Sequence, residues 1–119
     1  MKRKIAIVDD SAIALSWAQD ALTAHGHEVV THSSPFGINR LLRESGADVL
    51  LLDIHMPALN GVSTCKLLKS RGKSKLLIVL YSSLTMAELA EKAQEATADG
   101  YVRKTGSVQE FIDQLNAFL

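Results

Sequence analysis

The sequence predicts an α/β fold in which a parallel sheet is covered by helices on both faces. Three apolar runs, at residues 5–8, 49–52 and 76–81, are short and continuous, and such runs are typical of strands buried on both sides. A stretch with helical character follows each predicted strand, so strand and helix alternate five times along the chain. This alternation favours parallel strands joined by helical crossovers.

Length and charge limit the classes to which the chain can belong. Its 119 residues fit one domain, residues 1–119, and a hydrophobic content of 47% is enough for a core. Because 13 basic and 13 acidic residues balance, neither nucleic acid nor an anionic membrane is an expected partner. The first apolar run is too short for a signal peptide, and no stretch approaches the ~20 apolar residues of a membrane span. We therefore expect a soluble, cytoplasmic protein.

Cysteine and histidine usage indicates neither disulfides nor zinc. Cys65 is the only cysteine, so a disulfide within the chain is impossible and a reducing compartment is expected. Cys65 itself is predicted to be a small core residue. The spacing of the four histidines matches no zinc pattern, and we expect ordinary surface or helix-end residues.

The first strand, at residues 5–8, ends in an acidic pair, and Ser11 is a favourable N-cap for the helix that follows. Gly26 is predicted to end this helix. Ile13 and Leu15 fall outside the apolar face and are predicted to be exposed. The residues predicted to face the core are Ala14, Trp17, Ala18, Ala21 and Leu22.

The second strand, at residues 28–31, is less apolar than the others, which places it near an edge of the sheet. Ser34 and Pro35 are typical of the N-cap and the first position of a helix, which we expect to continue to about residue 44. Gly46 is predicted to end it. Its expected core contacts are Phe36, Leu41 and Leu42.

The third strand, Val49–Asp53, is the most apolar and ends in a carboxylate. The loop predicted at residues 54–61 contains the helix breakers Pro57, Asn60 and Gly61. A helix at residues 62–70 follows and is predicted to end at Gly72. Its core-facing residues are expected to be Cys65 and Leu68.

Two further units complete the sheet. The strand at residues 76–81 leads through Ser82 into an alanine-rich helix at residues 86–96. The strand at residues 100–103 ends at Lys104, and residues 107–110 form a capping box that opens the last helix. The apolar positions of this helix are Val108, Phe111, Ile112, Leu115, Phe118 and Leu119.

Right-handed crossovers leave few topologies open, and one of them has the flavodoxin-like strand order 2-1-3-4-5. We therefore predict a flavodoxin-like (βα)5 three-layer sandwich with a five-stranded parallel sheet. In this order the first and third strands are neighbours where the strand order reverses. Ligand sites of open α/β sheets lie at the carboxyl ends of strands at such a point.

Polar residues follow four strands at that end of the sheet: Asp9 and Asp10, Asp53, Ser82, and Lys104. Alone, each has an ordinary interpretation as a helix cap, a turn residue or a solvated lysine. Together, three close carboxylates repel one another, and a hard cation with oxygen ligands, Mg²⁺ rather than Ca²⁺, would neutralise them. Lys104 and Ser82 would then bind phosphate oxygens, and Asp53 could act as a nucleophile that forms an acyl phosphate.

With a few further positions, these residues resemble the receiver domain of bacterial two-component response regulators, and the resemblance covers the whole chain. The matching residues lie in order on the expected elements. They are Asp9, Asp10, Asp53, Met56, Pro57, Gly61, Ser82, Tyr101 and Lys104. The likeness is to a single-domain, chemotaxis-regulator-like protein, whose output comes from a protein partner or from a domain outside this chain.

The resemblance implies a role for each position. Asp53 would accept a phosphoryl group from the phosphohistidine of a sensor histidine kinase or phosphotransfer protein. Asp10, Asp53 and the backbone carbonyl of His55 would bind Mg²⁺ directly, and Asp9 would act through a coordinated water. Lys104 would neutralise charge on the transferring group.

Ser82 resembles the switch hydroxyl of the family, and Tyr101 the switch aromatic. Their movement would remodel the face formed by the helix at residues 86–96, the strand at 100–103 and the last helix, for a downstream partner. The implied function is a signalling switch, not an enzyme with a separate substrate: its only chemistry would be self-directed phosphotransfer and autodephosphorylation.

Two positions depart from the family pattern. Thr105 follows the lysine where proline with a cis bond is usual, and we expect a trans bond because a non-proline cis bond costs ~3 kcal/mol. Leu84 lies two residues after Ser82, beside the route of the hydrolytic water in this family. Since leucine cannot orient water, we predict a long-lived phosphoryl group.

Three other functions compete with the switch. A haloacid-dehalogenase-like phosphatase needs D-x-D on the first strand and a cap, whereas this strand ends Asp9-Asp10-Ser11. A flavodoxin-like cofactor binder needs a phosphate-binding loop at that place, and Asp9 and Asp10 would repel a phosphate. A receiver-like interaction scaffold that works without phosphorylation stays open because of Thr105.

Overall fold

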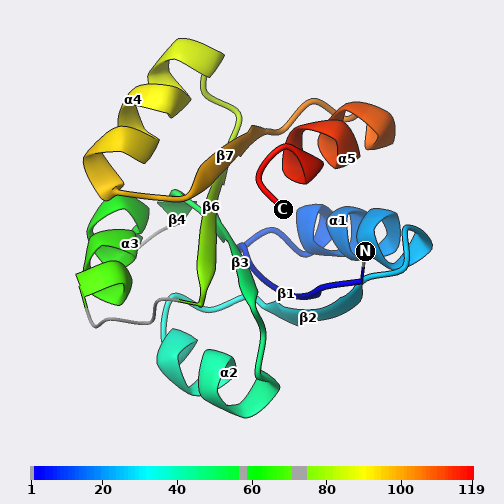
Figure 1. Cartoon of the computed structure of the whole chain (residues 1–119), viewed down its shortest axis with the longest axis horizontal. Coiled ribbons are helices and arrows are strands. Elements are labelled where there is room, and N and C mark those ends of the chain that lie inside the picture. Colours follow the sequence, from blue (N-terminus) through cyan, green and yellow to red (C-terminus); the bar gives the residue numbers. More distant parts are fainter. Residues whose placement is uncertain (1, 57–58, 71–74) are drawn as a thin grey trace.

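A computed structural model describes residues 2–56, 59–70 and 75–119 (Figure 1). Its strands are β1 (Lys4–Val8), β2 (Glu28–His32), β3 (Val49–Asp53), β4 (His55–Met56), β5 (Leu59–Asn60), β6 (Leu77–Ser82) and β7 (Gly100–Arg103). Its helices are α1 (Ala12–Ala24), α2 (Ile38–Ser45), α3 (Gly61–Ser70), α4 (Met86–Ala96) and α5 (Val108–Asn116).

Five parallel strands form the main sheet in the order β2-β1-β3-β6-β7, which is the flavodoxin-like order predicted from the sequence. β2 lies at an edge, as expected, and β3 is central. The register pairs Val8 with Leu52 and Asp53 with Tyr81. The carboxyl ends of β1, β3 and β6 therefore lie next to one another.

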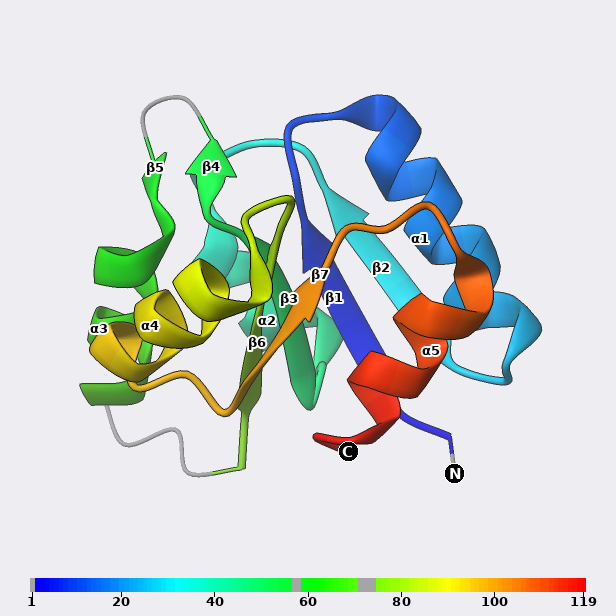
Figure 2. The same cartoon turned by 90° about the horizontal axis from the view of Figure 1, so that it is seen from above.

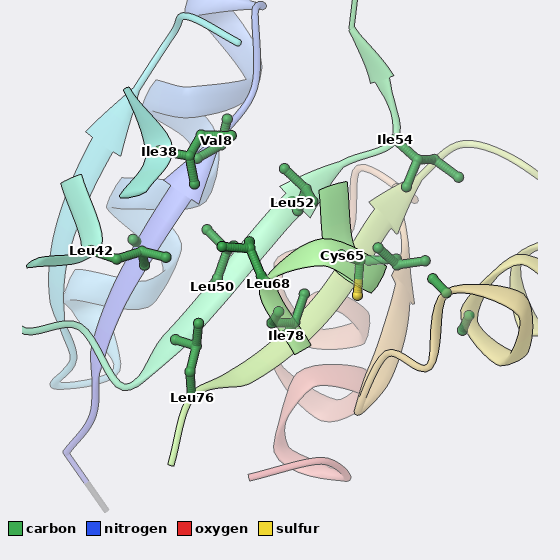
Figure 3. Close-up of a cluster of buried hydrophobic side chains, with 14 of the residues drawn as sticks. Val8, Ile38, Leu42, Leu50, Leu52, Ile54, Cys65, Leu68, Leu76 and Ile78 are labelled. Carbon is green, nitrogen blue, oxygen red and sulfur yellow. The ribbon is translucent and has the colours of Figure 1, made fainter. Parts of the chain in front are cut away.

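The sheet is the middle of three layers (Figure 2). Alternate residues of β3 face opposite sides: Leu50 and Leu52 pack with α2, α3 and α4, and Val49 and Leu51 pack with α1 and α5. Figure 3 shows the first of these clusters, into which Leu50 and Leu52 point from the sheet. Both faces of β3 are apolar because both are covered, which explains its uninterrupted hydrophobic run.

The buried face of α1 differs in one residue from the prediction. Ile13 is exposed, as expected, but Leu15 is buried. Leu15 lies on the same helix face as Ala18 and Leu22, at spacings of three and seven residues, and this row faces the sheet. Trp17 is half-buried and packs on Phe111 of α5, with ring centroids 5.2 Å apart.

The helix predicted to begin at Pro35 begins three residues later, at Ile38. Its N-cap is Gly37, whose φ of 81° lies in the left-handed region and therefore interrupts any helix that started earlier. The Ser34 hydroxyl instead accepts a hydrogen bond from the Phe36 N–H (3.0 Å) in a local turn. Phe36, predicted to be in the core, is 72% exposed, whereas Leu42 is buried as expected.

The segment after β3 is more regular than the predicted loop. β4 and β5 pair as a short antiparallel hairpin, and the Asn60 side chain accepts a hydrogen bond from the Ser63 N–H (3.1 Å) at the start of α3. Cys65 and Leu68 face the core, as predicted, and burial raises the pKa of the Cys65 thiol to about 11. Pro57 and Gly72, the predicted loop breaker and helix end, lie outside the described residues.

The last helices begin where the sequence predicts. The Thr85 hydroxyl accepts from the Glu88 N–H (3.2 Å) at the start of α4, and the Ser107 hydroxyl accepts from the Glu110 N–H (3.3 Å) at the start of α5. Phe111, Ile112 and Leu115 are buried. Val108 is 41% exposed, although its apolar character suggested the core. Within the described parts of the chain, no helix is both long and apolar enough to cross a membrane.

Candidate functional site

The loops after β1, β3, β6 and β7 lie at the same end of the sheet (Figure 2). This end carries Asp9 after β1, Asp53 at the end of β3, Ser82 at the end of β6 and Lys104 after β7. The parallel order brings these residues together although they are far apart in the sequence.

Three carboxylates form the centre of the site. Oxygens of Asp9, Asp10 and Asp53 lie within 4.8 Å of one another. Asp9 is fully buried and Asp53 is 4% exposed, whereas Asp10 faces solvent. The Ser11 N–H donates to Asp9 Oδ1 (3.0 Å), and the His55 N–H donates to Asp53 Oδ1 (2.9 Å), so the backbone holds both buried carboxylates in place.

Lys104 supplies the positive charge. Its Nζ lies 2.9 Å from Asp9 Oδ2 and 3.5 Å from Asp53 Oδ2. Its backbone N–H donates to the Ser82 carbonyl (2.8 Å), which continues the β6–β7 ladder by one bond. The bond to Thr105 is trans, as predicted. The replacement of proline by Thr105 therefore leaves Lys104 in contact with the carboxylates.

Burial raises the pKa of the Asp53 carboxyl, and the charge of Asp9 raises it further. The His55 N–H and the Lys104 ammonium oppose this shift because they favour the ionised form. When all groups are ionised, three carboxylates and one ammonium leave two negative charges. A small divalent cation with oxygen ligands matches both this charge and this donor set.

Ser82 is buried at the end of β6, directly after Tyr81, which pairs with Asp53 in the sheet, and its hydroxyl accepts from the Leu84 N–H (3.2 Å). Tyr101 is not part of the cluster. It lies half-buried on β7, against Phe118 with ring centroids 5.6 Å apart, and packs on the core that includes α4. Most of the predicted site residues therefore lie together at the acidic cluster, and Tyr101 lies apart from them.

Sequence reasoning missed the role of Tyr81. The Lys104 Nζ lies 4.8 Å from the centre of the Tyr81 ring, a cation–π distance, and the ring also packs on Phe111. Burial and the charges of Asp9 and Asp53 hold the pKa of Tyr81 above its usual value. Tyr81 could have been singled out because it ends an apolar run directly before Ser82. The residues that its ring contacts, however, are distant in the sequence.

Gly61 allows α3 to pack directly against the chain that follows Asp53. A Cβ at this position would lie 2.6 Å from the Cα of Ile54 and 2.8 Å from its side chain. Any side chain at residue 61 would push Ile54 away and would move its neighbour Asp53. Glycine is required at residue 61 because the chain approaches Ile54 closely there, and not because of an unusual φ.

The family model of the response regulator receiver domain matches residues 5–116. The chain belongs to this family. The receiver domain is 25% identical over its whole length to the polar-differentiation response regulator DivK of Brucella ovis, of which it covers 98%. The CheY4 chemotaxis response regulator of Vibrio cholerae has the same fold, with a TM-score of 0.88, 22% identity and full coverage of both chains. The DrrB receiver domain, solved in a BeF₃-activated form, is 29% identical with a TM-score of 0.78, over 99% of this chain and 97% of its own.

The protein is therefore a receiver domain of a two-component response regulator, a signalling domain and not an enzyme of the ordinary kind. The acidic cluster of Asp9, Asp10 and Asp53 fits the phosphorylation site of such a domain.

Proposed function

We propose that this receiver domain is a phosphorylation-dependent switch in which Asp53 is the phosphoacceptor and Mg²⁺ is the cofactor. The donor is the phosphohistidine of a sensor histidine kinase or a phosphotransfer protein. The observation that carries the proposal is the position of Asp53, buried at the end of the central strand together with Asp9 and Asp10 and with Lys104 Nζ 3.5 Å from its carboxylate.

An oxygen of the ionised Asp53 carboxylate attacks phosphorus, the bond from phosphorus to the histidine nitrogen breaks, and that nitrogen keeps the electron pair. Lys104, 3.5 Å from Asp53, is close enough to bind an oxygen of the transferred group. Asp10, Asp53 and the His55 carbonyl would hold Mg²⁺ directly, and Asp9 through a water. When bound, a divalent cation would neutralise the charge of the incoming phosphoryl group, which the two net negative charges of the site would otherwise repel.

The same site supplies a switch. Ser82 is buried at the end of β6, next to the strand that ends in Asp53, and its hydroxyl would donate to a phosphoryl oxygen on Asp53. Leu84 would respond to a movement of Ser82 toward the phosphoryl group. Its N–H donates to the Ser82 hydroxyl, and its carbonyl accepts from Arg103 Nε of β7 (3.0 Å). With an inward rotation of Tyr101, the α4–β7–α5 face would change shape for a downstream protein or an output domain. A shift between two such states needs only a few kcal/mol.

The test is a titration of ¹⁵N-labelled protein with Mg²⁺ and beryllofluoride, a phosphoryl mimic, followed by amide chemical shifts. We expect saturable shifts at Asp53 and Ser82 that extend to Tyr101 and α4, and their loss in Asp53→Asn. Asp20→Asn, which changes an exposed aspartate of α1, is the matched control and should respond like the wild type.

Two results would contradict the proposal in different ways. An absence of binding in the wild-type protein would favour an interaction scaffold that works without phosphorylation. Shifts confined to the acidic site would leave Asp53 as a phosphoacceptor but would remove the switch.

A further inference from the structure

A groove separates the start of α2 from α3, on the side of the sheet opposite α1 and α5. It has a volume of about 270 Å³, and its lining includes Phe36, Ile38, Asn39, Thr64, Leu67 and Leu68. We call it the α2–α3 groove. None of its lining residues belongs to the acidic site or to the α4–β7–α5 face. Figure 1 shows α2 and α3 apart from α5 and from the end of β7.

Two large apolar side chains stand in solvent on opposite sides of this groove. Phe36 is 72% exposed and Leu67 is 52% exposed. The backbone of Phe36 is fixed on both sides, because its N–H donates to the Ser34 hydroxyl (3.0 Å) and its carbonyl is bonded to His32 Nε2. The phenyl ring is therefore presented from a fixed backbone. A preorganised aromatic residue beside a hollow is typical of the anchor point of a protein interface.

The residues that line the groove are uncharged, and the charges on the two helices that flank it are mostly positive. Gly37 gives α2 an N-cap without a side-chain hydrogen bond, and the first turn of α2 contains no acidic residue, so the N–H groups at this helix end favour an anion. Arg43 lies one turn beyond the lining residue Asn39 and is exposed. In the described residues no ion pair involves Arg43 or the exposed Lys66 of α3.

We propose that the α2–α3 groove binds an acidic amphipathic helix of a partner protein. A bulky apolar side chain of that helix lies between Phe36 and Leu67, and a neighbouring carboxylate lies at the N-terminus of α2. An apolar groove between two helices is the usual site for such a helix. A second copy of this chain is the weaker candidate, because a two-fold interface would place two basic surfaces against each other.

This contact does not depend on Asp53. The groove residues lie outside the α4–β7–α5 face, so the partner would bind with or without a phosphoryl group. The contact would keep the receiver domain at a partner while the α4–β7–α5 face is switched. If the groove binds no such helix, the proposed function of Asp53 is unaffected.

The probe is a short synthetic helical peptide with leucines on one face and glutamates on the other, titrated into ¹⁵N-labelled protein. A peptide with the same leucines but lysine in place of glutamate is the control. We expect saturable shifts at Phe36, Ile38, Asn39 and Leu67 with the acidic peptide and none with the basic peptide. Addition of Mg²⁺ and beryllofluoride should leave the affinity unchanged.

Exposed positions allow variants that do not disturb the fold. Phe36→Ala and Leu67→Ala should each weaken the acidic peptide by at least about tenfold. Asn39→Asp should also weaken it, because the new carboxylate at the α2 N-terminus repels the peptide. Met86→Ala, which removes an exposed apolar side chain from α4, should have no effect.

The proposal is overturned if the acidic peptide does not bind, if both peptides bind equally, or if the shifts lie on α4 and α5. A concentration-dependent dimer that Leu67→Ala abolishes, detected by sedimentation, would overturn it in favour of a second copy as the occupant.

Discussion

Asp53 lowers the stability of the metal-free fold, and its proposed role as phosphoacceptor explains why this loss of stability is tolerated. Burial and the neighbouring Asp9 raise its pKa above the ordinary value of an aspartate, so its ionised form is less stable in the folded protein than in the unfolded chain. The stability that goes with a raised pKa is present at low pH and is lost as pH rises through the folded-state pKa. At neutral pH, Asp53 therefore destabilises the metal-free fold.

From this follows a prediction for Asp53→Asn. In metal-free buffer at neutral pH, the variant should melt a few degrees above the wild-type protein in a thermal denaturation followed by circular dichroism. The difference should shrink as the pH falls and Asp53 becomes protonated in both states. Mg²⁺ should raise the Tm of the wild type more than that of the variant, because the variant lacks one ligand. A lower Tm for Asp53→Asn without metal would contradict the assigned cause of the pKa shift.

Leu84 is the residue that should set the lifetime of the phosphoryl group. It is half-buried two residues after Ser82 and has no polar side-chain atom with which to orient a water. We predict a half-life of minutes or longer after removal of the phosphoryl donor, measured by intact-protein mass spectrometry over time. Leu84→Gln should shorten it severalfold, while Ile13→Gln, at an exposed residue of α1, should not. A wild-type half-life of seconds would count against this role.

At the residue scale the sequence predicted most of the side chains that the fold brings together at the acidic cluster. Asp9, Asp53, Ser82 and Lys104 each follow a short apolar strand, and parallel strands bring such positions together. It did not reveal the contact between Lys104 and the Tyr81 ring, or the bond from Arg103 to Leu84, because each joins residues that are far apart in the chain. The expectation that the histidines lie at the surface was wrong for His27, which is buried.

At the scale of elements, the edge strand β7 packs against the residues that follow α5. A Cβ on Gly100 would lie 2.3 Å from the Phe118 ring, and that ring packs on Tyr101. Gly100→Ala should therefore displace Phe118 and destabilise the fold by about 1–3 kcal/mol in urea denaturation. In a double-mutant cycle with Phe118→Ala, the cost of Gly100→Ala should fall to a small fraction of its value. An unchanged cost in the absence of the ring would exclude the clash as its cause.

Element boundaries were predicted best where a cap is local. Thr85 and Ser107 begin α4 and α5 through hydrogen bonds within one turn, which a short sequence window contains. The start of α2 was wrong because Ser34-Pro35 suits a turn as well as a helix, and the left-handed Gly37 decided between them. The exposure of Phe36 follows from that shift. Leu15 was misplaced because the sheet selects which row of α1 is buried.

At the scale of the whole molecule, stability should depend on pH through His27. His27 is buried, and its Nδ1 accepts a hydrogen bond from the Arg3 N–H (3.1 Å), which requires the neutral ring. Burial lowers the pKa of His27, nearby His25 and Arg3 add to this, and Asp48 opposes it. Since the unfolded chain binds the proton more readily, His27 should favour folding above pH ~6.5 and cost stability progressively below it.

The measurement is urea denaturation of the wild type at pH 7.5, 6 and 5, with His27→Gln and His25→Gln as variants. The loss of stability toward pH 5 should be smaller in His27→Gln than in the wild type, and His25→Gln should keep most of it. Equal losses in all three proteins would exclude His27 as the titrating group.

The whole fold was the most predictable level, because five alternations of strand and helix with right-handed crossovers leave few arrangements. The distribution of charge was not predictable from a net charge of zero. In the folded protein α2 and α3 carry Arg40, Arg43, Lys66 and Lys69 against Glu44, whereas α4 and α5 are predominantly acidic. The surface of α2 and α3 therefore suits an acidic partner, and the surface of α4 and α5 suits a basic one.

The central claim is that Asp53 is the single site of phosphorylation and needs a divalent cation. The most direct test is incubation of the protein with acetyl phosphate and Mg²⁺, followed by intact-protein mass spectrometry. We expect a gain of one phosphoryl group in the wild type, and no gain in Asp53→Asn or when the metal is chelated. An unmodified wild-type protein, or a phosphoryl group that persists in Asp53→Asn, would contradict it.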